Sequence, residues 1–262
     1  MDARLMLLPL LIAAAQPAVA PDPVVIALVA GEGDRKCLPD KSLCLDVPGN
    51  AEASDGGLVL TAPATGEADD LALPYGRDDG QSLSLWPHLI AVPSPEGTAA
   101  DSRQYLMGVI VGTSTMYSGG GGNGSRLHLL RLDTAPSNTR LGDEVFDVVW
   151  DSSLMIRACF SEKDMKDRRE ACHDEYGFTG ALAAGPAETG ELPALTYRSV
   201  ATTYPRLSRR SEDNSGVRLS AADLVHAKDP ECSYERTLRY NPATSRYEMD
   251  RPAPDCSDYT TP

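Results

Sequence analysis

Residues 104–132 read QYLMGVIVGTSTMYSGGGGNGSRLHLLRL. The first part, Gln104–Thr115, is apolar and contains Val and Ile, and Arg126–Leu132 partly alternates apolar with polar residues, as strands do. The intervening MYSGGGGNGS has the composition of a turn. The stretch therefore predicts two strands joined by a flexible hairpin loop.

Other short apolar runs, separated by turn residues, continue this pattern on both sides. Strands are predicted at 24–30, where the first strand is expected to be buried, and at 57–62, 82–92, 144–150, 154–160, 176–184 and 195–203. A short helix is predicted to start at Ser220, with Asp223 completing its cap. Many short strands with frequent turns predict a mainly β fold: an antiparallel sandwich or a barrel-like fold with one or two short helices.

A C-terminal hairpin is the clearest single element. In CSYERTLRY (232–240), strand alternation places Tyr234, Arg236, Leu238 and Tyr240 on one face. The sequence NPAT then supplies a turn, and RYEMD returns with Tyr247 and Met249 on one face. Such tyrosines stabilise strand pairs; the alternative is that they form a binding surface.

Length and charge exclude several classes of protein. The chain has 262 residues with 24 Lys and Arg against 38 Asp and Glu, a net charge of −14, which excludes a chain-wide nucleic-acid binder. The apolar content of 42% is too high for a disordered chain. Residues 21–100 hold 13 acids and only 4 bases, so a domain boundary near residue 100 is the one division that composition indicates.

The first twenty residues predict a signal peptide. The apolar run Leu5–Ala15 follows the basic residue Arg4 and is too short to span a membrane. Small residues allow cleavage after Ala15 or Ala20; a retained anchor is the alternative. No later apolar run reaches 18 residues. We therefore expect residues 21–262 to form a β-rich region exported to the periplasm or secreted, without a transmembrane segment after cleavage.

Cysteine usage agrees with export. The six cysteines are an even number, as expected for disulfides in an oxidising compartment, and pairing of sequence neighbours is predicted: Cys37 with Cys44, Cys159 with Cys172, and Cys232 with Cys256. Zinc binding is not predicted, because no C-x-x-C occurs.

The middle pair raises a geometric conflict. Its insert FSEKDMKDRREA looks helical, with a Ser161/Asp164 cap and opposite charges at Glu162/Lys166 and Asp164/Arg168. A straight helix of that length would separate the cysteines by about 18–20 Å, whereas a disulfide needs less than about 7 Å. Either the helix is short and the chain doubles back, or these cysteines pair elsewhere.

Cofactor and metal motifs are incomplete. Gly119, Gly121 and Gly124 form a G-x-G-x-x-G pattern, but a strand rather than a helix is expected after it, so no dinucleotide cofactor is predicted. GRDDGQ (76–81) lacks the alternating ligands of a calcium loop, so no metal site is predicted.

Catalytic residues do not stand out either. No G-x-S-x-G occurs, and Ser114 has only the first of its two glycines. A composite hydrolase site using His88, His128, His173 or His226 is an alternative that sequence leaves open.

One basic segment interrupts the acidic chain. Five arginines, Arg198, Arg206, Arg209, Arg210 and Arg218, lie within 21 residues. They are expected to pair with the acidic N-terminal part of the protein. The alternative is an anionic partner, an envelope glycan or an acidic protein, bound on a surface formed by Arg206, Arg209, Arg210, Tyr234, Tyr240 and Tyr247.

Together these features favour an exported, disulfide-bonded protein with a non-catalytic binding role in the cell envelope or extracellular space. The alternatives are an exported hydrolase and an inhibitor of a basic exogenous enzyme, the latter suggested by the charge of −14.

Overall fold

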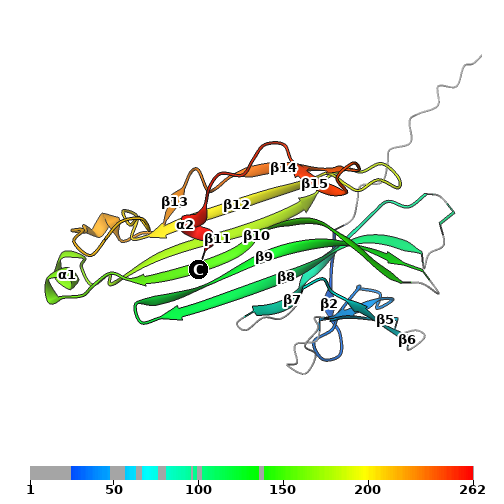
Figure 1. Cartoon of the computed structure of the whole chain (residues 1–262), viewed down its shortest axis with the longest axis horizontal. Helices are drawn as coiled ribbons and strands as arrows, with labels where there is room; N and C mark the ends of the chain where they lie inside the picture. The colour runs from blue at the N-terminus through cyan, green and yellow to red at the C-terminus, as the bar shows by residue number, and fades with distance from the viewer. Residues whose placement is uncertain are drawn as a thin grey trace, which may run out of the picture.

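The computed structural model describes residues 25–47, 57–62, 67–75, 81–95, 97–98, 102–135 and 139–261, which form two antiparallel sheets (Figure 1). In spatial order, the ten-stranded sheet contains β1 (Val25–Ala27), β7 (Gln81–Ala91), β8 (Arg103–Tyr117), β9 (Gly120–Thr134), β10 (Arg140–Arg157), β11 (His173–Ala184), β12 (Leu195–Tyr204), β14 (Glu235–Asn241) and β15 (Arg246–Met249), with β13 (Ala227–Asp229) beside β12. The five-stranded sheet contains β2 (Val29–Ala30), β3 (Lys36–Cys37), β4 (Cys44–Asp46), β5 (Gly57–Ala62) and β6 (Glu67–Ala72). The helices are α1 (Glu162–Asp167), the single 3₁₀ turn η1 (Ala221–Asp223) and α2 (Ser257–Thr260).

This architecture confirms the predicted mainly β, antiparallel fold with short helices. The strand order is open in both sheets, so the described residues form packed sheets and not a closed barrel. Within the same ranges, no helix has the length and apolarity needed to cross a membrane. The predicted signal peptide, residues 1–20, lies outside the described residues, and a domain boundary near residue 100 stays a prediction.

Two apolar cores hold the layers together. The small sheet packs on the large one through Leu45, Leu58 and Leu60, which meet side chains such as Met107 and Leu130. A second core is built from long strands of the large sheet and its C-terminal hairpin, and includes Trp86, Leu127, Phe178, Tyr197 and Leu238. Because β8 contributes to both cores, its residues Tyr105–Val109 are buried on both faces.

The central hairpin is longer and tighter than predicted. Strands β8 and β9 pair without interruption from Arg103 opposite Thr134 to Tyr117 opposite Gly120, so the chain turns at Ser118 and Gly119. The expected flexible loop over 116–125 is therefore wrong. Its glycines other than Gly119 belong to β9, where β10 approaches closely: a Cβ atom on Gly122 would lie 2.7 Å from the carbonyl oxygen of Ser153.

The strand predicted at 24–30 is divided between the sheets. Val25–Ala27 pairs with β7 and Val29–Ala30 pairs with β3. Between them, the Leu28 N–H donates to the Pro87 carbonyl oxygen at 2.9 Å. Val25 and Val29 are 38% and 40% exposed, so the expected burial is wrong, because both short strands lie at sheet edges.

The predicted strands at 144–150 and 154–160 are one strand, β10, which ends at Arg157. Its pairing with β9 shifts register between Val149 and Asp151, so one strand continues through an irregularity. The Ser152 hydroxyl is buried there and donates to the Asn123 carbonyl oxygen at 2.9 Å.

All three predicted disulfides are present: Cys37–Cys44, Cys159–Cys172 and Cys232–Cys256. The middle pair forms because α1 has only six residues and the chain then reverses at Arg169 and Glu170, whose φ values are 54° and 69°. This brings the two Cα atoms to 4.8 Å, which is the short-helix alternative.

The cap predicted for α1 is confirmed, since the Ser161 hydroxyl accepts the Asp164 N–H at 3.2 Å. The predicted pairing of Asp164 with Arg168 is wrong. Arg168 follows the end of the helix and turns into the protein, where it is fully buried and bonds the Asp174 carboxylate at 2.5 Å. At Ser220, the second predicted helix is the single turn η1, and Asp223 accepts the Ser220 N–H at 2.8 Å.

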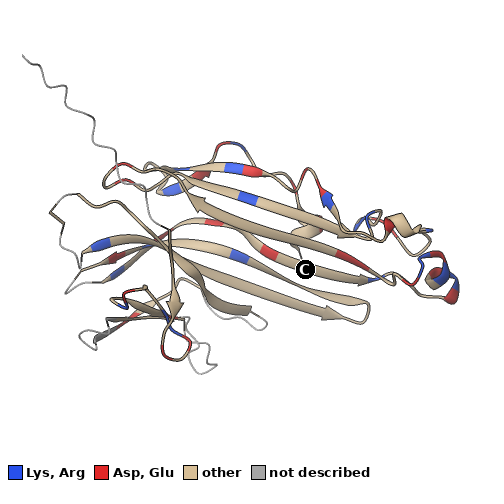
Figure 2. Cartoon of the chain, turned by 180° about the vertical axis from the view of Figure 1, so that it is seen from behind, with Lys and Arg blue, Asp and Glu red and all other residues tan. Residues whose placement is uncertain are grey.

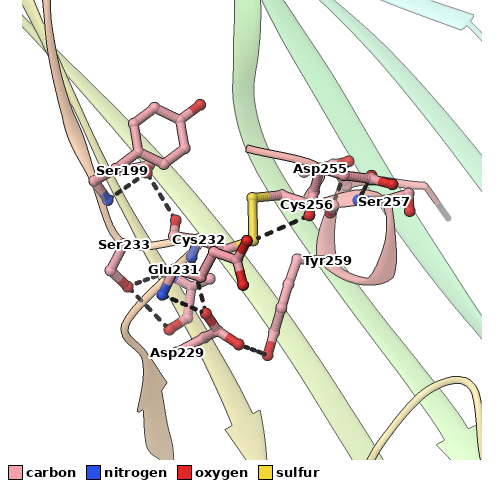
Figure 3. Close-up of a disulfide and its surroundings, with 12 residues drawn as sticks. Ser199, Asp229, Glu231, Cys232, Ser233, Asp255, Cys256, Ser257 and Tyr259 are labelled. Carbon is pink, nitrogen blue, oxygen red and sulfur yellow. Dashed lines mark hydrogen bonds between the residues drawn. A yellow bond between two sulfur atoms is a disulfide. The ribbon is translucent and has the colours of Figure 1, made fainter. Parts of the chain in front are cut away.

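The disulfide between Cys232 and Cys256 attaches the C-terminal segment to the sheet (Figure 3). Asp229 accepts the backbone N–H of Cys232 at 2.8 Å and the Tyr259 hydroxyl at 2.9 Å. On the other side, the Ser199 hydroxyl donates to the Cys232 carbonyl oxygen at 2.8 Å. The disulfide therefore ties the start of α2 covalently to the turn that contains Cys232, and a hydrogen bond from Ser199 holds this turn on β12.

Replacing Gly122 with Ala is expected to destabilise the protein by about 1–3 kcal/mol, because the added methyl group meets the backbone of β10. Urea denaturation measures this change. Gly119→Ala is the matched control, since its Cβ would meet nothing closer than Tyr117 at 3.9 Å. Equal stability of the two variants would contradict the close approach of β9 and β10.

Candidate functional site

The six residues predicted as one binding surface do not lie together. Arg206, Arg209 and Arg210 follow the C-terminal end of β12, whereas Tyr240 and Tyr247 face each other in the hairpin, which pairs with the start of β12. The length of that ten-residue strand, about 33 Å, separates the two groups.

Each of the three arginines donates hydrogen bonds to groups in the C-terminal half of the chain. Arg206 Nε donates to the Asp223 carboxylate at 2.9 Å. Arg210 donates to the carbonyl oxygens of Ser257 and Thr261, and Arg209 donates to that of Ser208 at 2.9 Å.

The first and last arginines of the basic segment also pair with groups in the C-terminal half of the chain. Arg198 pairs with Glu235 and Arg218 with Asp167. Between described residues, the expected pairing of this segment with the acidic N-terminal part is not found, because acids and carbonyl oxygens of the C-terminal half lie closer and bond the arginines.

The tyrosines pack mainly inward. Tyr247 is only 5% exposed and donates to the Pro193 carbonyl oxygen at 2.7 Å. Its ring lies 5.7 Å from that of Tyr240, the residue directly opposite on β14. Tyr234 is half-buried beneath Arg236, whose guanidinium lies 4.6 Å from the ring centre. The contact between Tyr240 and Tyr247 is the cross-strand stabilisation that the alternation indicates. A binding role for the tyrosines stays a prediction.

A different surface of the large sheet is uncovered, and we call it the open face. Strand pairing from β8 to β13 places three rows of side chains on it. The middle row contains Ser114, Asn123, Ser153, Gly177, Thr202 and Lys228; the flanking rows contain Gly112, Ser125, Asp151, Thr179 and Val200, and Met116, Gly121, Met155, Glu175 and Tyr204.

On β10, β11 and β12 the two sides of the sheet differ sharply in burial. Every residue of the open face is exposed or half-exposed. On the opposite side, Leu154, Tyr176, Phe178 and Ala201 are buried. That side is covered in part by α2, where the Tyr259 and Tyr176 ring centres are 6.2 Å apart. The difference follows from strand alternation, since successive residues point to opposite sides.

Short side chains predominate on the open face. Most of its positions are Gly, Ser, Thr or Asn, and the longer apolar side chains lie in the outer rows, where Met116 is 91% and Met155 45% exposed. Charged residues gather instead at α1 and the loops beside it, and the long strands are drawn mostly tan in Figure 2. The face therefore offers many uncharged hydrogen-bonding groups on a rigid support.

The open face has few ionisable groups: Asp151 in one flanking row, Glu175 and Tyr204 in the other, and Lys228 at the β13 end of the middle row. Partial exclusion of water raises the pKa of Asp151 above its usual value. Beside the flanking row that ends at Tyr204, the Glu175 carboxylate lies 4.0 Å from His226 Nε2. The His226 ring lies 5.0 Å from that of Tyr204. Glu175, Tyr204 and His226 thus form a polar and aromatic corner.

A second polar cluster surrounds Glu144 and joins three parts of the fold. Its carboxylate accepts from Tyr75 at 2.5 Å, from His128 Nδ1 at 2.8 Å and from Arg246 at 2.9 Å. Tyr75 follows the small sheet, His128 belongs to β9 and Arg246 to β15. Because an ionised carboxylate only accepts, the Nδ1 atom of His128 carries a hydrogen here.

This environment sets the charge state of Glu144. Burial raises its pKa, but the hydrogen bonds from Tyr75, His128 and Arg246 outweigh burial and hold the pKa below its ordinary value. Asp147 extends the cluster, since it pairs with Arg126 and accepts from Arg246 at 2.9 Å. The cluster is therefore an electrostatic link between β15, β10 and the small sheet.

In the described part of the chain, no histidine is hydrogen-bonded to a serine as a hydrolase site would require. His128 bonds Glu144, His226 lies near Glu175, His88 packs at 4.8 Å on Trp86, and His173 is exposed at the start of β11. Hydrogen bonds between described residues do not join any of the four to a Ser, Thr or Cys side chain. Nothing in these contacts favours the hydrolase alternative.

The same ranges contain no group of three or more His, Cys, Asp or Glu side chains placed to hold a metal ion. The weak calcium pattern at 76–81 lies outside the described residues except for Gln81, which begins β7.

Comparison of the chain with protein-family models, with curated proteins and with solved structures finds no significant match to any of them. The function therefore has to be inferred from the geometry of the molecule.

Sequence reasoning missed both the open face and the Glu144 cluster. For the open face the signal is present: in VGTSTM (111–116) and DSSLM (151–155), every second residue lies on it, as the pairing shows. For Glu144 no local signal exists, since Tyr75 and Arg246 lie 69 and 102 residues away.

Replacing Glu144 with Gln is expected to lower the free energy of unfolding at pH 7 by about 1.5–3 kcal/mol, through weaker hydrogen bonds from its three donors. The folded-state pKa is lowered, so the carboxylate stabilises the protein above its unfolded pKa of about 4.3. That contribution is lost as the pH falls through the folded-state value. The gap between wild type and variant should therefore narrow from pH 6 to pH 3.

Urea denaturation across this pH range measures the effect. Asp143→Asn, at the exposed neighbouring residue, is the control for removal of one carboxylate. A gap that stays constant from pH 6 to pH 3 would show that the charge of Glu144 does not stabilise the fold.

Proposed function

We propose that this protein is exported and acts by binding a partner on its open face, without catalysing a reaction. Three disulfides support export, because such bonds persist mainly in oxidising compartments. The short apolar run at the start of the chain, Leu5–Ala15, supports it independently. The site of action is then the periplasm, the cell envelope or the medium.

The observation that carries the binding role is the composition of the open face. A face that serves only for solubility is expected to carry many Lys, Glu and Asp side chains. This one carries mainly Gly, Ser, Thr and Asn, although the chain as a whole has 62 charged Asp, Glu, Lys and Arg residues. Short side chains lose little rotamer entropy when a ligand orders them.

The support behind the face is equally suited to binding. Strands hold side chains in place more precisely than loops do. Behind the face, Leu154, Tyr176 and Phe178 are at most 2% exposed, and the Cys232–Cys256 disulfide ties down the segment that covers them. A partner would therefore meet a surface that is already in its bound shape.

Replacing Ser153 with Arg places a long charged side chain at the centre of the open face. We expect this variant to bind purified envelope material of the source organism at least tenfold more weakly than wild type, measured by co-sedimentation of the labelled mature protein. Thr179→Arg, in a flanking row, should act in the same direction. Ser211→Arg is the matched control, because Ser211 is exposed in the arginine-rich loop and off this face.

Circular dichroism and thermal midpoints establish that all three variants fold. If Ser153→Arg and Thr179→Arg sediment like the wild-type protein, the open face is not the binding surface. Export has a separate test. The full chain is expressed, and its periplasmic and secreted fractions are analysed by mass spectrometry. Retention of the intact N-terminus in the cytoplasm would contradict it.

A further inference from the structure

We propose that a small zwitterion of the α-amino acid class binds in a cavity between the α1 end of the large sheet and the arginine-rich loop that follows β12. The cavity is separate from the open face, so this inference goes beyond the function proposed above. It is carried by a buried hydroxyl group that lacks an acceptor, by a rigid polar wall, and by unpaired charges of both signs around the same cavity.

The cavity lies where the end of β10, the start of β11 and loop residues 210–215 meet, and its volume is about 210 Å³. Its apolar lining residues are Ile156, Ala158 and Phe160. A water molecule takes up about 30 Å³ in the liquid, so the cavity has room for about seven non-hydrogen atoms. Pockets for drug-sized ligands are larger, at roughly 300–1,000 Å³. The size therefore indicates a very small ligand.

The hydroxyl group of Tyr176 is the clearest sign of a ligand. Tyr176 is only 2% exposed, lines the cavity, and accepts a long hydrogen bond of 3.5 Å from the Asn214 amide. Among the residues that the structure describes, no group accepts the hydroxyl hydrogen of Tyr176. Because buried tyrosine hydroxyls usually have a partner, an acceptor inside the cavity would complete this one.

Buried polar contacts hold the wall of the cavity in place. The fully buried Arg168 donates to the Asp174 carboxylate at 2.5 Å and to the Asn214 carbonyl oxygen. The Ser208 hydroxyl donates to the same carboxylate oxygen at 2.5 Å. Asn214 closes the loop by donating to the Arg209 carbonyl oxygen at 2.9 Å. Moving the loop to fill the cavity would break these bonds, and Arg168 already balances the charge of Asp174.

Four other charged side chains line the cavity, two of each sign: Arg157, Arg210, Glu212 and Asp213. Within the described ranges, no ion pair includes any of the four. Arg157 Nε donates to the Cys159 carbonyl oxygen at 2.8 Å, and Arg210 Nη1 donates to carbonyl oxygens near the C-terminus. The other guanidinium N–H groups of both arginines have no acceptor among the described residues.

An α-amino acid matches this arrangement, because its carboxylate and its ammonium group are attached to the same carbon atom. The carboxylate would accept from the free guanidinium N–H groups and from the Tyr176 hydroxyl, in charge-assisted hydrogen bonds. The ammonium group only donates, and the carboxylates of Glu212 and Asp213 only accept. An anion alone would leave these carboxylates unpaired, and a cation alone would leave the arginines unpaired. The 65% exposed ring of Phe160 offers apolar contact to a small aliphatic side chain.

The test is isothermal titration of the mature, oxidised protein at pH 7 with four probes. L-Alanine and L-valine are the zwitterions, sodium acetate carries only the carboxylate, and ethylammonium chloride carries only the ammonium group. We expect at least one of the two amino acids to bind to a single site. Acetate and ethylammonium should bind at least tenfold more weakly, because each satisfies charges of one sign only.

Two variants connect this binding to the cavity. Tyr176→Phe removes only the hydroxyl group that lacks an acceptor, and Arg210→Gln removes one positive charge from the lining. Each should weaken binding of the amino acid at least fivefold. Circular dichroism and thermal midpoints establish that both variants fold.

Three controls should bind the amino acid as the wild type does. Tyr117→Phe removes the hydroxyl of an exposed tyrosine at the end of β8, and Arg218→Gln removes an exposed arginine that pairs with Asp167. Ser153→Arg changes the open face and not the cavity. Binding of neither amino acid, acetate or ethylammonium binding as tightly as the amino acid, or full binding by Tyr176→Phe or Arg210→Gln would overturn the inference. None of these results bears on the open face, whose test is the sedimentation of Ser153→Arg with envelope material.

Discussion

The close contact between β9 and β10 is the constraint on which the large sheet depends. A Cβ atom on Gly122 would stand 2.7 Å from the Ser153 carbonyl oxygen, a separation that a real side chain does not reach. Because β9 has glycine there, β10 pairs with it as far as Ile156 opposite Gly120. Strand β11 then pairs with β10 and β12 pairs with β11, so these strands together form the open face.

Polar interactions then hold the parts of the fold that the long strands do not connect. Glu144 receives hydrogen bonds from Tyr75, His128 and Arg246, which come from three different parts of the chain. At the other end of the sheet, the buried Arg168 bonds Asp174 and the carbonyl oxygen of Ala171. Both clusters leave the open face itself uncovered, and the disulfide of Cys232 adds a covalent tie behind it.

Local patterns predicted much of this fold correctly. The antiparallel β class, the C-terminal hairpin, the cap at Ser161 and all three disulfides follow from alternation, capping residues and cysteine spacing. The glycine-rich segment misled the same reasoning, because glycine favours turns in isolation. Only the neighbouring strand β10 makes glycine the residue required within a strand there.

The sequence by itself determined the mainly β class, where the chain is cross-linked and how strongly acidic it is, because these depend on near neighbours and on composition. Tertiary structure alone decided what the surface offers. It separated Arg206 from Tyr240 by the length of β12 and buried Tyr247. It also aligned Ser114, Asn123 and Ser153 from three strands. Contacts between such distant residues depend on strand register, which is set by the whole sheet and not by any one segment.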